Sequence, residues 1–124
     1  MASTTVRFIT IASALMLLLH CTYAAAPPIF QQRQYAKTWC VAKPSADEVA
    51  LRANLQFACS ESDCSAIDGT GGCSVLYGGT LLSRTSVAMN AYYQANGRNS
   101  WNCFFNGTGL ISLTDPSLGT CKYA

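Results

Sequence analysis

The cysteines constrain this chain more than any other feature of its sequence. Seven cysteines occur in 124 residues, and the first, Cys21, lies in an apolar leader. The other six are spread through the rest of the chain: Cys40, Cys59, Cys64, Cys73, Cys103 and Cys121. An even set in a short chain behind a leader is typical of a disulfide framework. We therefore expect three bridges, although the cysteine count alone leaves all fifteen pairings open.

The leader has the three parts of a secretory signal. Met1 to Arg7 carries one basic residue and no acid, Phe8 to Leu19 is almost entirely apolar, and small and polar residues follow up to Ala26. A 12-residue helix rises about 18 Å, too little to span a bilayer core of about 30 Å. We expect a signal peptide over residues 1–24, cleaved after Ala24, and no membrane insertion.

After cleavage the chain is short and nearly neutral. Loss of the leader takes Arg7 from the eight basic residues and leaves all six acidic ones, so the net charge becomes +1. That balance argues against nucleic acid or an anionic membrane as a partner. The residues after Cys121 are not a hydrophobic tail, so no glycolipid anchor is expected. We expect a secreted, extracellular monomer.

The only histidine, His20, lies in the leader. Its removal excludes His-based triads and His-containing zinc sites from the mature chain. In an oxidising compartment the cysteines form bridges rather than a metal site. The six carboxylates are better explained as helix-start, loop and turn residues than as a glycosidase pair. We predict no enzyme activity, no catalytic residue, no metal and no cofactor.

Residues 25–38, which include Pro27-Pro28, predict an N-terminal arm, and residues 39–124 predict one domain. Within it, Ser45 and Glu48 match a capping box, so we expect a first helix from Ser45 to Ala58. Apolar residues recur at helical spacing and are expected to face the core. They are Val49, Ala50, Ala53 and Phe57, with Leu51 and Leu55 in a second row.

A second helix is expected from Leu81 or Ser83 to Ala95, ended by Asn96-Gly97. The Ser- and Gly-rich segment from Cys59 to Cys73 predicts a loop that a Cys59–Cys64 bridge could close. Residues 101–113 predict a short hairpin turning at Asn106-Gly107-Thr108.

The same tripeptide is an acceptor sequence for N-glycosylation, and in a secreted chain we expect Asn106 to be modified. Aromatic rings are the other candidates for function, because their faces stack on the apolar faces of sugars. We expect half or more of the rings to be structural, including Trp39 and at least one of Tyr92 and Tyr93.

Several ordered motifs, together with the six cysteines, resemble the plant family-43 carbohydrate-binding module, also called the X-eight domain. The resemblance covers Trp39 to Tyr123. The motifs are Trp39-Cys40-Val41-Ala42-Lys43-Pro44, Asp63-Cys64-Ser65-Ala66-Ile67, Ala88-Met89-Asn90-Ala91-Tyr92-Tyr93-Gln94, Asn96-Gly97-Arg98 and Asp115-Pro116-Ser117 through Cys121.

The resemblance implies an α+β fold of two packed helices and a small antiparallel sheet. It also implies a specific pairing of the cysteines: Cys40 with Cys103, Cys59 with Cys64, and Cys73 with Cys121. The family occurs alone, in small pollen allergens and callose-binding proteins, and as a C-terminal part of glucan endo-1,3-β-glucosidases. Its members bind linear β-1,3-glucans.

The resemblance thus implies that the chain binds β-1,3-glucan (callose) in the plant cell wall without hydrolysing it. We select Trp101 and Phe104 as the first sugar-binding candidates and Tyr77 as the next.

The chain departs from the family pattern at several positions. Tyr77-Gly78-Gly79 lacks a common proline, Val87 stands in place of a ring, and Phe104 in place of an aspartate. These departures motivate two alternatives. The chain could be a disulfide-rich structural or signalling protein with lost or altered glycan binding, or a module that targets a separate β-1,3-glucanase to glucan.

Overall fold

The computed structural model describes residues 36–124. Lys37–Ala124 forms one compact unit. The predicted signal peptide, residues 1–24, and most of the predicted arm, residues 25–38, lie outside the described residues. None of the helices within the described part is long and apolar enough to cross a membrane.

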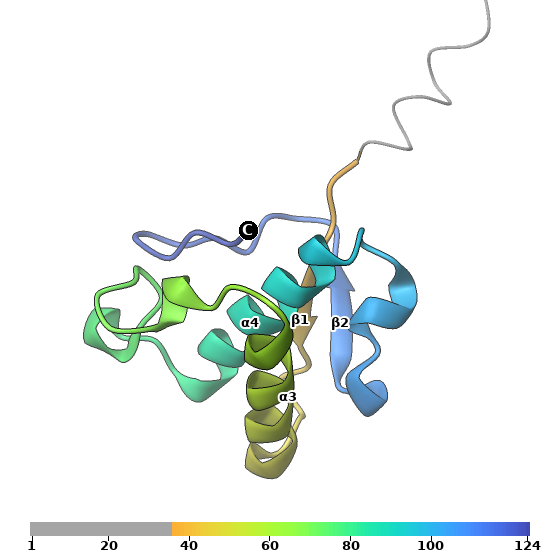
Figure 1. The fold of residues 1–124 in the computed structure, drawn as a ribbon, viewed down its shortest axis with the longest axis horizontal. Helices are drawn as coiled ribbons and strands as arrows, with labels where there is room; N and C mark the ends of the chain where they lie inside the picture. Colours follow the sequence, from red (N-terminus) through yellow and green to blue (C-terminus); the bar gives the residue numbers. More distant parts are fainter. Residues whose placement is uncertain (1–35) are drawn as a thin grey trace, which may run out of the picture. The chain divides into compact units, whose positions relative to one another are not determined.

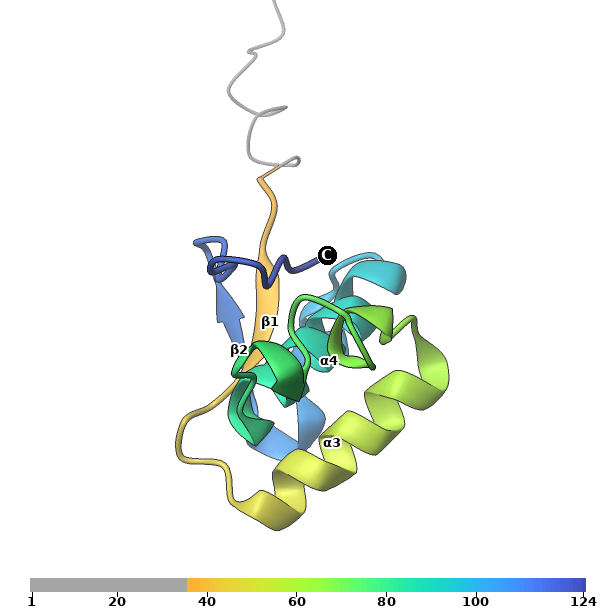
Figure 2. The ribbon, with the colours of Figure 1, turned by 90° about the vertical axis from the view of Figure 1, so that its left-hand side faces the viewer.

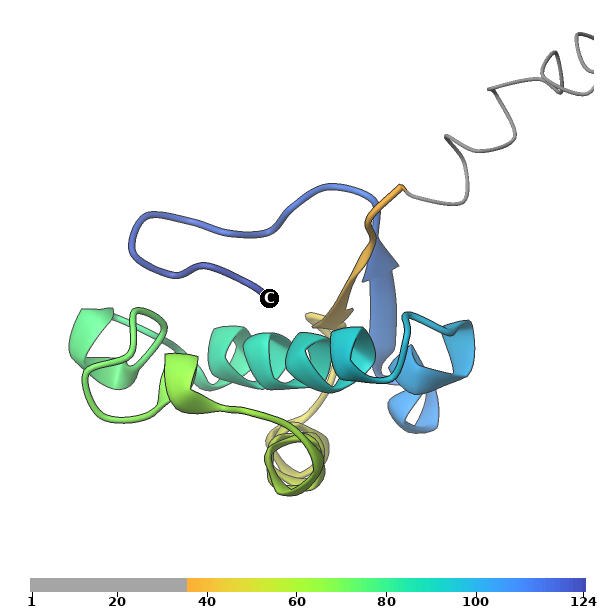
Figure 3. The same cartoon turned by 45° about the horizontal axis from the view of Figure 1, so that its top comes forward.

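The unit is built from two α-helices and two strands, which confirms the α+β prediction (Figure 1). Strand β1 (Trp39–Ala42) pairs antiparallel with β2 (Gly109–Ser112), with Cys40 opposite Ile111. Helix α3 (Glu48–Glu61) and helix α4 (Leu81–Ala95) complete the fold. Figure 2 shows the two strands side by side. Figure 3 shows α4 between the sheet and α3, and α4 contacts α3, β1 and the 3₁₀ helices Ser65–Ile67 and Ser100–Cys103.

Helix α4 agrees closely with its prediction. It begins at Leu81, the first of the two expected starts, and Thr80 caps it by accepting a hydrogen bond from the Ser83 amide at 3.1 Å. It ends before Asn96 and Gly97, and Gly97 takes φ +87° as a helix-ending glycine does. Its residues from Thr85 to Asn90 are all buried, as expected for a helix covered on several sides.

Helix α3 differs from its prediction at both ends. The capping residue is Asp47, whose carboxylate accepts from the Ala50 amide at 2.7 Å, and not Ser45. Ser45 lies in a turn closed by a hydrogen bond from the Ala46 amide to the Lys43 carbonyl, so the chain becomes helical only after it. The helix then continues past Ala58 to Glu61.

The buried face of α3 also differs from the prediction. Leu51 and Ala58 are its buried residues, whereas Val49 is 79% and Phe57 48% exposed. The expected core-facing row is therefore wrong for Val49, Ala53 and Phe57, which are exposed. The second apolar row, Leu51 and Leu55, packs against α4. Only one face of α3 is buried, because α4 covers α3 on one side only.

The predicted hairpin over residues 101–113 is also wrong. Ser100–Cys103 and Phe105–Gly107 are short 3₁₀ helices, and β2 pairs with β1 instead. The reason is that residues 100–103 form a helical turn, in which the Asn102 amide donates to the Asn99 carbonyl at 2.9 Å. No extended strand therefore precedes Asn106 for β2 to pair with. Gly109 passes so close to Cys103 that a Cβ there would lie 1.7 Å from the Cys103 carbonyl oxygen.

The three disulfides join Cys40 to Cys103, Cys59 to Cys64, and Cys73 to Cys121. This is the pairing that the family resemblance implies. The sequence separations are 63, 5 and 48 residues. In the chain-entropy model the two long bridges stabilise the fold by about 4 kcal/mol each and the short one by about 2 kcal/mol. Cys40, Cys64, Cys73 and Cys103 are buried and belong to the hydrophobic core.

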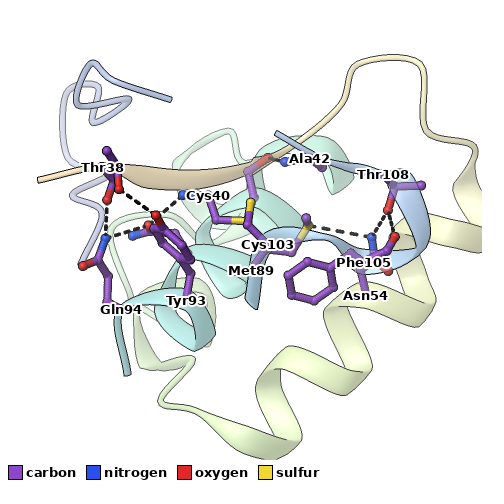
Figure 4. Close-up of a disulfide and its surroundings, with 12 residues drawn as sticks. Thr38, Cys40, Ala42, Asn54, Met89, Tyr93, Gln94, Cys103, Phe105 and Thr108 are labelled. Carbon is purple, nitrogen blue, oxygen red and sulfur yellow. Dashed lines mark hydrogen bonds between the residues drawn. A yellow bond between two sulfur atoms is a disulfide. The ribbon is translucent and has the colours of Figure 1, made fainter. Parts of the chain in front are cut away.

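Polar side chains of α4 bind the edge of β1 that β2 leaves free. The Cys40 amide donates to Asn90 Oδ1 at 3.1 Å, and the Ala42 amide donates to Ser86 Oγ at 2.9 Å. Gln94 Nε2 donates to the Thr38 carbonyl at 2.7 Å (Figure 4). Because Asn90 and Ser86 are buried, these bonds supply backbone partners that water cannot.

We predict that Asn90→Ala lowers the free energy of unfolding by about 2–4 kcal/mol. The change leaves the Cys40 amide without its acceptor and removes the bond from Asn90 Nδ2 to the Ala124 carbonyl. Each buried group left unpaired is worth about 1–3 kcal/mol. Urea unfolding with the disulfides intact measures the difference. Gln56→Ala, at an exposed amide on α3, is the control and should stay within about 0.5 kcal/mol. Equal midpoints for Asn90→Ala and wild type would contradict the assigned role of Asn90.

Candidate functional site

One hollow of the surface gathers four aromatic rings from three parts of the chain. We call it the aromatic pocket; its volume is about 310 Å³. Helix α3 contributes three of its residues, α4 contributes Tyr92, and the 3₁₀ segments after α4 contribute the others. The lining residues are Ala53, Asn54, Phe57, Tyr92, Trp101, Asn102, Phe105 and Asn106.

Three of the rings contact one another edge to face. The ring centroids are 5.2 Å apart for Phe57 and Tyr92, 5.8 Å for Tyr92 and Phe105, and 6.2 Å for Phe57 and Phe105. Each such pair adds about 0.5–1.5 kcal/mol beyond the burial of its surface. Phe105 also packs against both halves of the hydrophobic core. These contacts hold the three rings in place before any ligand arrives.

Trp101 at the rim of the pocket is more exposed than the three rings of this cluster. Its exposed fraction is 72%, whereas Phe57, the most exposed ring of the cluster, is 48% exposed. An exposed indole offers a large flat apolar face that loses little conformational freedom on binding. Trp101 is therefore free to contact a ligand, whereas Phe105 is tied into the core.

Amide side chains supply the polar part of the lining. Asn54 Nδ2 donates to Thr108 Oγ1 at 2.7 Å, and that hydroxyl donates to the Phe105 carbonyl at 2.5 Å (Figure 4). These bonds fix the orientation of Asn54. Asn102 Oδ1 is buried, and no group of the described residues donates to it. Rings beside amides can bind a molecule with apolar faces and hydroxyl groups, as a sugar has.

The turn that carries Phe105 has an unusual backbone. Phe105, Asn106 and Gly107 have φ values of +43°, +55° and +80°. Asn and Gly tolerate the left-handed region, but for Phe105 it carries a strain of about 1–2 kcal/mol. The turn sends consecutive aromatic residues to different places: Phe105 contacts the ring cluster, and Phe104 is 64% exposed.

The structure separates the three residues proposed from sequence. Trp101 lines the aromatic pocket, and Phe104 is exposed in the same segment after α4. Tyr77, 57% exposed, lies in the 3₁₀ helix Val75–Tyr77 that precedes α4. This 3₁₀ helix lies before the start of α4, whereas the segment with Trp101 and Phe104 follows the end of α4 (Figure 3).

Sequence reasoning missed Phe57, Asn54 and Asn102. The helical spacing of Phe57 predicts a core position, because spacing alone does not reveal which row of α3 faces α4. The two amides carry no motif. Trp39 is half-buried and Tyr93 is buried, as expected for structural rings. Val87 is buried in the core and also lines the hollow formed with Asp63 and Tyr123, so this departure from the family pattern lies away from the aromatic pocket.

Two other hollows have fewer rings. The larger, about 530 Å³, is lined by Asp63, Lys122 and Tyr123 among others. Hydrogen bonds from Ser65 hold the pKa of Asp63 below its usual value, and burial raises the pKa of Tyr123. The other, about 320 Å³, contains Tyr77 and Tyr123. Within residues 36–124, no three His, Cys, Asp or Glu side chains are grouped to hold a metal ion.

The X8 domain family model matches residues 38–110 of this chain. The chain therefore belongs to the X8 domain family. The matched range includes strand β1, both α-helices and every residue that lines the aromatic pocket.

Relatives of this chain carry names of three kinds. The major pollen allergen Ole e 10 of Olea europaea is 42% identical over 89 residues, covering 70% of this chain and 71% of the allergen. Plasmodesmata callose-binding protein 5 of Arabidopsis thaliana is 32% identical over 114 residues, 90% of this chain and 60% of that protein. A glucan endo-1,3-beta-glucosidase of Triticum aestivum is 45% identical over 85 residues, 68% of this chain but only 18% of the glucosidase.

We predict that the two kinds of ring in the pocket differ in their effect on stability. Phe105→Ala should lower the free energy of unfolding by about 2 kcal/mol, because a partly buried ring in contact with two others is lost. Trp101→Ala should change it by less than about 0.5 kcal/mol, because the indole is mostly exposed. Urea unfolding measures both. A large loss on removing Trp101 would show that this ring is structural and not free for a ligand.

Proposed function

We propose that this chain is a secreted, non-catalytic module that binds β-1,3-glucan (callose) in the plant cell wall, with Trp101 at its main contact. The observation that carries the proposal is the exposed indole on a preformed pocket of rings and amides. The apolar faces of glucose residues stack on the rings, and sugar hydroxyls bond to the amides.

The names of the relatives support glucan as the ligand. One is called a callose-binding protein, and others are glucan endo-1,3-beta-glucosidases that share only this domain-sized stretch with the chain. Callose is itself a β-1,3-glucan. A domain found both alone and attached to glucanases is suited to holding the polymer, which these two settings have in common.

The composition of the aromatic pocket supports binding without hydrolysis. Its eight lining residues are alanine, asparagine, phenylalanine, tyrosine and tryptophan, and none is acidic. Glycoside hydrolysis in most enzymes needs two carboxyl groups across the scissile bond. A glucan held at Trp101 would therefore meet a surface that binds but has no acid to protonate the leaving oxygen.

Three disulfides support an extracellular location, because such bridges form in oxidising compartments. We place the mature protein in the wall or apoplast after removal of residues 1–24, as a monomer. A pocket of about 310 Å³ lies at the small end of ligand sites. The affinity of one pocket for glucan is accordingly weak, and the repeated units of the polymer raise the overall avidity.

We predict that the secreted chain is retained on insoluble β-1,3-glucan above its retention on cellulose. Trp101→Ala should weaken binding about tenfold, equivalent to about 1.4 kcal/mol, because the most exposed ring of the pocket is lost. A depletion assay with increasing polysaccharide measures both affinities. Leu113→Ala is the matched control, since it removes an exposed apolar side chain outside the pocket.

Two further variants test the extent of the site. Phe104→Ala should weaken binding by a smaller factor, because Phe104 is exposed in the same segment as Trp101 but does not line the pocket. Tyr77→Ala tests a second contact at the other end of α4.

Retention on β-1,3-glucan no greater than on cellulose would refute the glucan proposal. Normal folding without glycan binding would favour the structural or signalling alternative. Recovery of a β-1,3-glucanase bound to the chain would favour a targeting role in trans.

A further inference from the structure

The glycosylation sequence lies at the aromatic pocket itself. Asn106 is one of the pocket's lining residues, together with Trp101 and Phe57, and its side chain is exposed. Asn106-Gly107-Thr108 is the only Asn-x-Ser/Thr sequence in the chain. A modification at Asn106 would therefore place sugars where the proposed ligand has to bind.

The backbone keeps Asn106 at this position. The residue has φ +55° and ψ +35°, between Phe105 and Gly107, which also have positive φ. Phe105 is held by its ring contacts to Phe57 and Tyr92. Thr108 on the other side is held by hydrogen bonds to Asn54 and to the Phe105 carbonyl. The attachment point is thus fixed at the rim on both sides.

We propose that an N-glycan on Asn106 covers the aromatic pocket and competes there with wall glucan, an inference that rests on the proposed sugar-binding function. The first sugar of an N-glycan is an N-acetylhexosamine joined to the amide nitrogen of asparagine. Its apolar ring face and acetyl methyl group suit the rings of Trp101 and Phe57. Glycosylation then sets the affinity of the module for its polymer.

Tethering makes this competition effective even if the attached sugars bind weakly. A ligand on a short tether has an effective concentration on the order of millimolar. A soluble glucan fragment with weak affinity for the same pocket has to displace the tethered glycan, so its apparent affinity is lowered. We expect removal of the glycan to tighten binding of a soluble β-1,3-linked oligosaccharide by at least about threefold, with the largest effect on contacts to Trp101.

The experiment compares three forms of the full chain. The first is wild type secreted from plant cells, with glycan occupancy at Asn106 measured by mass spectrometry. The second is Asn106→Asp from the same cells, which has the same polypeptide as wild type treated with a peptide N-glycosidase. Aspartate tolerates the left-handed backbone as asparagine does. The third is unglycosylated wild type from a bacterial periplasm, which separates the effect of the glycan from that of the added charge.

Thr108→Ala is not a suitable way to block modification. It would also remove the hydrogen bonds that Thr108 makes with Asn54 and the Phe105 carbonyl, and so disturb the pocket.

Two readouts separate this inference from the proposed function. Calorimetry measures binding of a soluble β-1,3-linked oligosaccharide to each form. Acrylamide quenching of tryptophan fluorescence measures exposure of Trp101 without any added glucan. We expect both unglycosylated forms to bind more tightly and to be quenched more strongly than the glycosylated form. In a Trp101→Ala background only Trp39 emits, and quenching should then be the same with and without the glycan.

Equal affinity and equal quenching in the three forms would overturn the inference, as would secretion from plant cells with Asn106 unmodified. If no form binds the oligosaccharide, the proposed function fails and competition fails with it. The quenching result still decides whether the glycan covers Trp101. Stronger quenching without the glycan supports coverage of the pocket, and unchanged quenching refutes it.

Discussion

The fold depends on the hydrogen bonds between the buried side chains of α4 and the backbone of β1. A sheet of two four-residue strands is marginal by itself in water. Asn90 and Ser86 give one edge of β1 the partners that a third strand would otherwise supply. A polar helix face thereby replaces a strand. Because these groups are buried, their partners have to come from the protein, and this requirement sets the position of α4 against the sheet.

The position of the aromatic pocket follows from that arrangement. β1 carries Cys40, and the Cys40–Cys103 bridge ties it to the segment that holds Trp101 and Phe105. The same segment packs Phe105 against Tyr92 of α4 and Phe57 of α3. Contacts with α3, α4 and β1 thus hold in place the segment after α4, whose own 3₁₀ helices are too short to be stable alone. The rings stay in place while the indole at the rim remains open to solvent.

Much of the frame could be predicted from the sequence, and the details of the site could not. The start of α4 at Leu81 and its end at Ala95, before Asn96-Gly97, have local signals, and the cysteine pairing followed from the family resemblance. The exposure of Phe57 depends on which face of α3 meets α4, which is a tertiary property. The expected hairpin failed because the sequence does not reveal that Ser100–Cys103 is helical and that β2 pairs with the distant strand β1. Asn54 acquires its role only through contact with Thr108, 54 residues away.

The crossing of Gly109 over Cys103 also makes closure of the fold sensitive to a single atom. A hydrogen is the largest group that fits there, since even a methyl group would lie 1.7 Å from the Cys103 carbonyl oxygen. Strand β2 begins at this glycine, and Cys103 is the bridge partner of β1. A side chain larger than hydrogen at residue 109 would therefore disturb the start of β2 and the surroundings of the Cys40–Cys103 bridge at the same time.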